Sequence, residues 1–343
     1  MAERALPLSV WPAAQRSSRA QRSERYLPVS GAHPAKMLPA IARAAIEAYT
    51  DPGDIVCDPM CGIGTTLVEA VHLGRDAVGV EYEPRWADLA AANVAYARAS
   101  GATGHGEVVT GDGRYVSSLV DPALRGLVAL VLTSPPYGPS LHGRVRTRPG
   151  RGVTKYNFTY SSDPANLGAV GLDALLQATR DILVSCARLL RPGGVVAMTV
   201  RPWRRAGELI DLPGALGRAG EEAGLVLFER NVALLAGLRD DGLVPRASFF
   251  ALDRARKSRR RGVPHLVIAH EDVLVFRTPD ERVARTALSC QRRQANSPAS
   301  PSVAERRDLE AGSTSLVGRG DDDHVAPAVS DAALFGDDGQ RQP

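Results

Sequence analysis

The amino-acid sequence predicts a Rossmann-like α/β fold with a doubly wound, mostly parallel sheet. Short apolar segments typical of buried strands alternate with longer segments whose apolar residues recur at helical spacing. Turns rich in glycine and proline separate these segments, and a regular alternation of strand and helix favours parallel pairing. Ligands of such sheets bind beyond the carboxyl ends of the strands, so we expect a site among the residues that follow the predicted strands.

The predicted elements follow one another in order along the chain. Helices are predicted at residues 37–49, 65–73, 84–96 and 172–190. Strands are predicted at residues 55–57, 77–80, 107–110, 127–132, 195–200, 225–235 and 265–276. The helix at 84–96 has a proline in its first turn, where the missing N–H is not needed. An Arg-Pro-Gly-Gly turn at 191–194 is expected to end the helix at 172–190.

The two ends of the chain differ in composition from this central part. Residues 1–25 are polar, rich in arginine and without periodicity, so we expect a disordered basic arm. Residues 279–343 are rich in Ser, Ala, Pro, Asp and Gly, which predicts a disordered acidic tail. One folded domain is therefore expected at residues 26–278. No apolar run reaches the roughly 18 residues of a membrane span and no secretory signal is evident, so we expect a cytoplasmic protein that does not enter membranes.

Charge and cysteine content narrow the class of partner and site. The formal net charge is +4, but residues 303–343 carry −5, which leaves +9 on residues 1–302. A basic body suits a polyanionic partner, although a bias towards arginine codons could produce the same charge. The four cysteines form no C-x-x-C pair, so we expect reduced thiols and no metal site.

A glycine-rich turn follows the first predicted strand in the sequence DPMCGIGTT, from Asp58 to Thr66. Gly62 and Gly64 let the backbone turn sharply and approach a ligand, and the next helix begins at once. A dinucleotide-binding turn would have a third glycine, which is absent here. The acid at the start suits a cationic ligand, such as the methionine part of S-adenosylmethionine with its ammonium and sulfonium groups.

Two more acids follow the next two predicted strands. Glu81 ends the second strand, where a carboxylate can accept both hydroxyls of a ribose. Asp112 follows the third strand, where an adenine would lie. Each acid alone is more commonly a helix cap or turn residue. Three successive strand ends that each offer an acid favour a site for S-adenosylmethionine.

The fourth predicted strand ends in Thr133-Ser134-Pro135-Pro136-Tyr137-Gly138. Two prolines fix the backbone and donate no hydrogen bonds, so the carbonyl groups there have no competing donors. The Ser134 hydroxyl and the Pro135 carbonyl could then accept hydrogen bonds from an exocyclic amino group, whose lone pair is otherwise delocalised into its ring. Tyr137 could stack on the base, which must leave a duplex to reach such a pocket.

These motifs resemble those of the amino-methylating DNA methyltransferases. Residues 33 to 93 resemble the N-terminal half of that family, and residues 134–137 resemble its (Asp/Asn/Ser)-Pro-Pro-Tyr signature. The resemblance implies the Rossmann-like fold of enzymes that use S-adenosylmethionine and no metal, with catalytic residues Ser134, Pro135, Pro136 and Tyr137. It implies a cofactor site made of His33, Lys36, Asp58, Pro59, Gly62, Gly64, Thr65, Thr66, Glu81 and Asp112.

The target base is less closely defined than the cofactor. A serine preceded by Thr133 is commonest among cytosine-N4 enzymes of the family, but serine also occurs among adenine-N6 enzymes. An RNA methyltransferase acting on guanine N2 of tRNA has similar loops and is an alternative. A nucleic-acid binder that has kept the fold without catalysis is another, although the intact motifs argue against it.

Two basic segments are candidates for contacts with DNA, or with RNA in the alternative reading. The insert at 141–171 interleaves basic and aromatic residues, among them Arg144, Arg146, Lys155 and Tyr156, which suits phosphate contact and base stacking. A run at 254–261 that includes Arg259 and Arg260 could bind phosphates, or could be an ordinary charged surface. We expect the insert to be a long loop, and no segment is large enough for a separate recognition domain.

Overall fold

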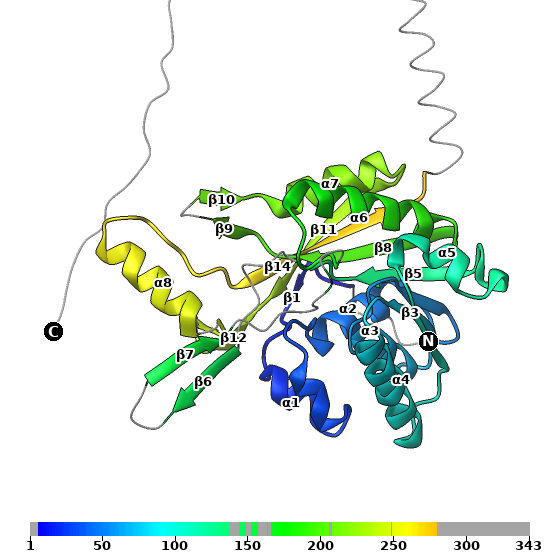
Figure 1. Ribbon diagram of the computed structural model, residues 1–343, viewed down its shortest axis with the longest axis horizontal. Helices are drawn as coiled ribbons and strands as arrows, with labels where there is room; N and C mark the ends of the chain where they lie inside the picture. Colours follow the sequence, from blue (N-terminus) through cyan, green and yellow to red (C-terminus); the bar gives the residue numbers. More distant parts are fainter. Residues whose placement is uncertain are drawn as a thin grey trace, which may run out of the picture. The chain divides into compact units, whose positions relative to one another are not determined.

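An eight-stranded sheet forms the centre of this computed structural model, in the order β1-β11-β14-β8-β5-β2-β3-β4 (Figure 1). The structure describes residues 6–136, 144–148, 152–156, 163, 166–205, 208–247 and 249–279. The described residues all belong to a first compact unit, Met1–Arg285, and a second unit, Thr286–Pro343, lies outside them. The expected acidic tail therefore falls outside the described residues, apart from residue 279.

Most neighbouring strands of the sheet are parallel, which confirms the predicted fold class. The strands are β1 (Val10–Trp11), β2 (Ile55–Asp58), β3 (Asp76–Glu81), β4 (Gly106–Thr110), β5 (Val128–Thr133), β8 (Leu190–Val200), β11 (Val226–Leu234) and β14 (His270–Arg277). The run β8-β5-β2-β3-β4 is parallel throughout. Only β14 runs against its neighbours β8 and β11 within this described sheet.

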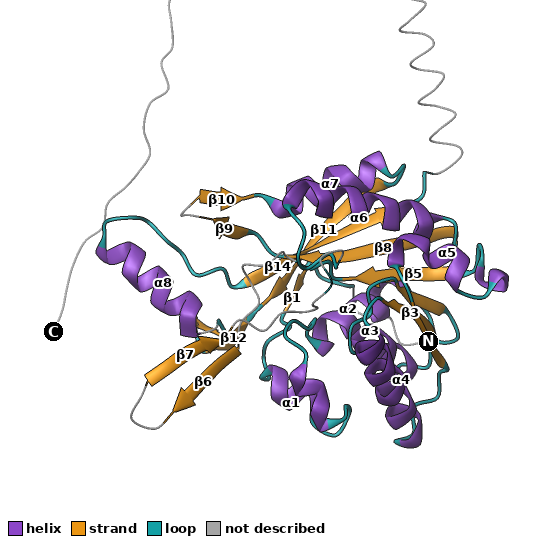
Figure 2. Cartoon of the chain, viewed as in Figure 1, coloured by secondary structure: helices purple, strands orange, loops and turns teal. Residues whose placement is uncertain are grey.

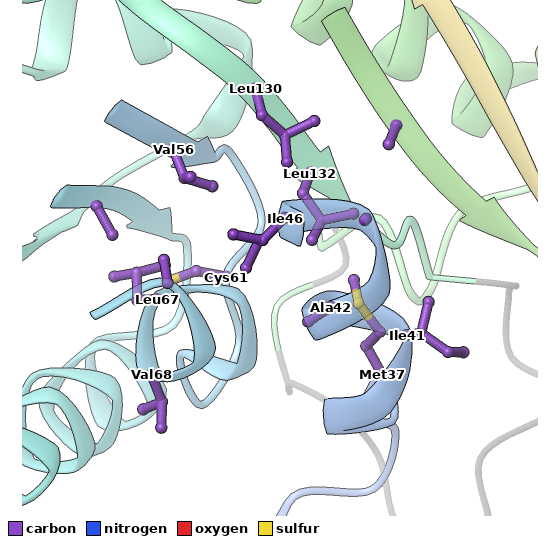
Figure 3. Packing of buried hydrophobic residues seen from close by; sticks show 14 of the residues in the cluster. Met37, Ile41, Ala42, Ile46, Val56, Cys61, Leu67, Val68, Leu130 and Leu132 are labelled. Atoms are coloured by element: carbon purple, nitrogen blue, oxygen red, sulfur yellow. The ribbon is translucent and has the colours of Figure 1, made fainter. Parts of the chain in front are cut away.

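Helices cover both faces of the sheet, as Figure 2 shows. One face is covered by α2 (Pro39–Tyr49), α3 (Thr65–His72) and α4 (Pro84–Ala99), and the other by α5 (Val116–Leu119), α6 (Leu172–Ala187) and α7 (Leu212–Glu222). Alternate residues of a strand point to opposite faces. Accordingly Leu130 and Leu132 of β5 pack with Ile46 of α2 (Figure 3), whereas Val131 packs with the α6 side.

Two boundaries on the second face differ from the prediction. The helix predicted at 172–190 ends at Ala187, and β8 begins at Leu190, because Leu190 already pairs with Val128 of β5 before an irregularity in the register. Helix α7 was not predicted, since three glycines interrupt its apolar pattern. One of them is required by packing: a Cβ on Gly220 would lie 2.3 Å from the Phe276 ring.

The prediction of a disordered arm at residues 1–25 is wrong for residues 6–25. Strand β1 adds to the edge of the sheet beside β11, and α1 (Ser18–Arg22) follows it. Trp11 and Arg22 are buried, and the Arg22 guanidinium donates to the Met37 carbonyl at 2.5 Å. Elements of two and five residues are too short to show a periodicity, so composition alone misled the prediction.

Three insertions leave the sheet at the edge where β2, β3 and β4 end. They carry the hairpin β6 (Arg144–Arg148) and β7 (Gly152–Tyr156), the hairpin β9 (Trp203–Arg205) and β10 (Glu208–Ile210), and a third part made of β12 (Ala236–Arg239), β13 (Gly242–Pro245) and α8 (Phe249–Arg260). The first two follow β5 and β8, and the third connects β11 to the antiparallel β14. The insert predicted as a loop thus contains a hairpin, and the basic run at 254–261 lies almost wholly on a helix.

Short 3-10 turns complete the described elements: η1 (Pro28–Ala32), η2 (Gly113–Tyr115) and η3 (Pro122–Leu124). No helix in the described part of the chain is both long enough and apolar enough to cross a membrane. The three cysteines in that part, Cys57, Cys61 and Cys186, are buried free thiols.

A buried carboxylate joins the N-terminal segment to the sheet-covering helices. Glu69 of α3 is fully buried and accepts from the Arg25 guanidinium at 2.6 Å and the Tyr26 hydroxyl at 2.9 Å. Arg43 of α2 contributes a second ion pair at 3.1 Å. Burial, and then the nearby Glu69 carboxylate, raise the pKa of Tyr26 well above its usual range, so its hydroxyl remains a donor.

Replacing Glu69 with alanine should lower the free energy of unfolding by about 2–4 kcal/mol, because it leaves the Tyr26 hydroxyl without this acceptor and two arginines without their charge partner. Urea denaturation followed by circular dichroism measures the change. Glu47→Ala, an exposed position on α2, is the matched control and should change stability by less than about 0.5 kcal/mol. Equal effects of the two substitutions would contradict the role of the network.

Candidate functional site

A pocket lies at the carboxyl edge of the parallel strands. It is lined by Pro59, Met60, Glu81, Tyr82, Asp112, Gly113, Arg114, Ser134, Pro136, Asn166, Leu167 and Ile182. The residues that follow β2, β3, β4 and β5 therefore meet around one space.

The loop between β2 and α3 turns sharply at two glycines. Gly62 and Gly64 have φ values of +58° and +79°, a region that other residues rarely adopt. A Cβ on Gly64 would also come within 3.2 Å of the Ala90 Cβ on α4. Thr65 and Thr66, which follow at the start of α3, are buried. These residues shape the loop rather than line the pocket.

Asp58 lies beneath this loop. Its carboxylate is 3% exposed and accepts from the Thr66 hydroxyl at 2.6 Å and the Met60 amide at 3.1 Å. Burial raises the pKa of Asp58 to about 6, although the hydrogen bonds from Thr66 and Met60 act in the opposite direction. Asp58 is absent from the pocket lining, so its described contacts hold the loop in place.

Glu81 faces the pocket from the end of β3. One carboxylate oxygen accepts from the Gly62 amide at 2.8 Å and the other from the Glu83 amide at 3.0 Å. Each oxygen can accept a further hydrogen bond, so the carboxylate can hold the loop and a ligand hydroxyl at once. Burial raises the pKa of Glu81 to about 7, against the effect of these amide bonds.

Asp112 is paired with an arginine that the sequence interpretation missed. The Asp112 carboxylate caps η2 by accepting from the Arg114 amide at 2.9 Å, and it also accepts from the Arg114 Nε at 2.9 Å. Partial burial alone would raise the pKa of Asp112, but the bonds to Arg114 hold it below the usual value. A ligand in this part of the pocket therefore meets an Asp–Arg pair. The proximity of Arg114 to Asp112 in the chain is the signal that could have revealed it.

The end of β5 closes the pocket from the other side. Ser134 and Pro136 line it and are half-buried, while Pro135 between them is buried. Tyr137 lies outside the described residues. Ser134 and Pro136 thus face the same space as the predicted cofactor acids Glu81 and Asp112, whereas Pro135, whose carbonyl was predicted as an acceptor, is not among the lining residues.

His33 and Lys36 lie apart from the pocket lining. His33 is buried and packs edge-on against Trp86 of α4, with ring centroids 4.6 Å apart. The Lys36 ammonium donates to the His33 carbonyl at 2.5 Å. These contacts fix the segment before α2 against α4.

Several lining residues were missing from the sequence prediction. Tyr82 directly follows Glu81, and its hydroxyl donates to the Asp163 carboxylate at 2.7 Å. The Asn166 side chain, which is buried, donates to the Glu83 carboxylate at 3.1 Å. Tyr82 could have been found from its place at a strand end, but Asn166 belongs to no motif.

The predicted nucleic-acid contacts lie on insertions from the same edge of the sheet. Arg144 and Arg146 are in β6, and Lys155 and Tyr156 are in β7, where Arg144 is paired with Tyr156. Arg259 and Arg260 are exposed on α8. The exposed side of α8 also carries Arg254, Arg256 and Lys257, of which Lys257 pairs with Asp253 at 2.8 Å.

A protein-family model matches the N-terminal part of this chain. Residues 3–92 match a family model described as DNA methylase. The chain is 34% identical over 107 residues to a tRNA (guanine(10)-N2)-dimethyltransferase of Methanocaldococcus jannaschii. The aligned segment covers 31% of this chain and 30% of that protein. The chain is also 41% identical over 64 residues to the Type II methyltransferase M.XycI of Xanthomonas campestris pv. cyanopsidis. That aligned segment covers 19% of this chain and 21% of the relative.

The chain spans less than a third of the length of these curated relatives. Among solved structures it is similar to TrmN from Thermus thermophilus, with 18% identity, a TM-score of 0.45, and coverage of 76% of this chain and 53% of that one. In the described residues no group of three or more His, Cys, Asp and Glu side chains is placed to hold a metal ion. The match to the DNA methylase model covers residues 3–92, the part of the chain that holds Asp58, the loop at residues 59–64 and Glu81.

Proposed function

We propose that this protein methylates an exocyclic amino group of a base in DNA, most readily N4 of cytosine, with S-adenosylmethionine as the methyl donor. One observation carries the proposal: Ser134 and Pro136 line the same pocket as Glu81 and Asp112. A base held at the end of β5 would then lie next to a cofactor held at the ends of β3 and β4. The match of residues 3–92 to the DNA methylase model supports DNA as the substrate.

The residues around the pocket suit this cofactor chemically. Glu81 would accept the ribose hydroxyls, and the Asp112–Arg114 pair would contact the adenine. The loop at residues 59–64 would enclose the methionine part, with the buried negative charge of Asp58 beneath it. A Cβ on Gly113 would lie 2.3 Å from the Pro59 carbonyl oxygen, so the loops after β2 and β4 already touch through their backbones.

Ser134 and Pro135 would orient the amino group of the base. Their oxygens accept its two hydrogens, which favours a more tetrahedral nitrogen with its lone pair directed at the methyl group. S-adenosylmethionine supplies a methyl group bound to a cationic sulfur, which keeps the bonding electrons when the nitrogen attacks. The nitrogen then loses one proton along its hydrogen bond to Ser134 and on to solvent. Such a base would have left the duplex.

A second candidate is methylation of guanine N2 in tRNA. The relative from Methanocaldococcus jannaschii, at 34% identity over 107 residues, is the observation that favours it. Adenine N6 in DNA is the alternative target within the first proposal, since Ser134 is compatible with both. The Thr133-Ser134 pair is the sequence feature that favours cytosine over adenine as the target base.

Incubation with labelled S-adenosylmethionine and either duplex DNA or tRNA distinguishes these substrates, when the methylated nucleoside is then identified. We expect N4-methylcytosine from DNA. N6-methyladenine would correct the target base, and transfer to tRNA alone would overturn the DNA proposal.

Ser134→Ala should lower kcat roughly hundredfold, because one of the two acceptors for the amino group is lost. Its Kd for S-adenosylmethionine should stay within about twofold of wild type. Ser100→Ala, at an exposed position after α4, is the control and should retain full kcat. Full activity of Ser134→Ala would show that the end of β5 does not hold the amino group.

Cofactor binding should weaken as the pH falls through about 7, the pKa of Glu81 in the free protein. Above this pH the carboxylate can accept both ribose hydroxyls, whereas the protonated form loses an acceptor position. Calorimetric titration between pH 5.5 and 8.5 measures the trend. Glu81→Gln should bind more weakly at high pH and lose the dependence near pH 7; an unchanged pH profile in this variant would assign the trend elsewhere.

The double substitution Arg259→Ala and Arg260→Ala should weaken DNA binding to a similar degree on all sequences. If both side chains contact phosphates, the slope of log K against log salt should fall by about 1–2. Fluorescence anisotropy at several salt concentrations measures it. Arg98→Ala, at an exposed position near the end of α4 and away from the insertions, is the control and should leave the slope unchanged. An unchanged slope in the double variant would show that α8 lies outside the interface.

A further inference from the structure

The segment at residues 26–33, here called the strap, packs against α3 and α4 beside the cofactor loop, residues 59–64. At one end the Tyr26 hydroxyl donates to Glu69 at 2.9 Å and lies 3.4 Å from the Thr65 carbonyl oxygen. At the other end His33 packs against Trp86. Between these two points the strap is held by Asn93, a residue of α4.

Asn93 is fully buried and makes four hydrogen bonds through its side chain. Its carbonyl oxygen accepts from the Leu27 amide and the Ser30 hydroxyl, both at 3.0 Å. Its amide nitrogen donates to the Ser30 hydroxyl and to the Ile63 carbonyl, both at 2.9 Å. A backbone N–H only donates and a backbone carbonyl only accepts, so the contacts with Leu27 and Ile63 determine which way the side-chain amide faces.

Ile63 stands between Gly62 and Gly64, where the backbone has the most freedom. Two side chains from outside the loop restrain this part of it. Glu81 accepts from the Gly62 amide at 2.8 Å, and Asn93 donates to the carbonyl of the next residue. The first restraint comes from the pocket wall, and the second comes from α4, which also holds the strap.

We propose that Asn93 is a positioning residue for the cofactor: by holding the Ile63 carbonyl it fixes the loop conformation that places Pro59 and Met60 in the pocket wall. Asn93 itself does not line the pocket. A loop held in the binding conformation before the ligand arrives loses less entropy on binding, so the effect falls on cofactor affinity. The inference rests on the proposed function only in taking S-adenosylmethionine as the ligand of this pocket.

Asn93→Ala in the full chain tests this inference, with Kd for S-adenosylmethionine measured by calorimetry. We expect Kd to rise about tenfold, because the Ile63 carbonyl loses its buried donor and the loop is free to reorient. At saturating cofactor, kcat should stay within about twofold of wild type, since the residues at the end of β5 are untouched. Ser30→Ala, which leaves the bonds of Asn93 to Ile63 and Leu27, should change Kd less than threefold.

Ser185→Ala separates positioning from a general loss of stability. Ser185 is buried in α6, accepts from the Ser117 amide at 3.1 Å and does not contact the loop. It should lower Tm and leave Kd unchanged. If Asn93→Ala lowers Tm while its Kd equals that of wild type, the inference is overturned. Asn93→Asp, which keeps both acceptor contacts with the strap, replaces Asn93→Ala if the latter does not fold, with the same two outcomes.

Failure of the proposed function would look different. A wild-type protein that does not bind S-adenosylmethionine would overturn the cofactor assignment and this inference with it. Binding without methyl transfer to DNA would overturn the substrate proposal alone, and the comparison of Kd values among the variants would still decide the role of Asn93.

Discussion

The parallel pairing of β5, β2, β3 and β4 is the constraint on which the site depends. Parallel strands in register end at the same edge of a sheet, so the residues that follow them are neighbours whatever their distance in the chain. Pairing of Cys57 with Val78 and with Val131 sets this register in the middle of the sheet. A slip of one residue would exchange the two faces of a strand and turn its buried side chains towards the wrong helices.

Burial of two acids at this edge acts against stability, and under the proposed function it would favour the binding of a cationic cofactor. Asp58 is 3% and Glu81 5% exposed, and desolvation raises the pKa of both carboxyl groups. Backbone amides and the Thr66 hydroxyl offset part of that cost. What remains is a concentration of negative potential in a site of low polarity, where it attracts a cation more strongly than it would in water. Under the proposed function, the groups that hold the loop would also prepare it for a charged ligand.

The sequence was sufficient to predict the strands and helices that have a periodic apolar pattern, and the residues that mark their ends. Buried strands and amphipathic helices have a periodicity, and glycines or prolines mark their ends, so β2, β3 and β5 were placed within about one residue of their bounds. Asp112 was found in this way, but Arg114 was not, because a pairing between side chains leaves no periodic trace. Asn93 was equally hidden: an asparagine on a helix is normally a surface residue, and only the packing of the strap buries it.

Elements built on long-range contacts were beyond prediction for a physical reason. Strand β1 has two residues, and they form a strand because they pair with the edge of β11; their own sequence does not indicate one. Helix α8 was not predicted for another reason: its basic residues obscure the buried Ala255, so no apolar pattern marks the helix. The tertiary contact decides the local structure in both cases, and a local pattern cannot report it.

The pairing of β1 with β11 also has a consequence for biosynthesis. Val10 pairs with Val232, so β1 leaves the ribosome well before its partner strand, which is made 222 positions later. Until then Trp11 has no sheet to cover it, and the emerging chain exposes both this side chain and an unpaired edge. Contacts of such long range slow folding and lengthen the time during which an intermediate can aggregate. The N-terminal edge is therefore where we expect a nascent chain of this protein to need a chaperone.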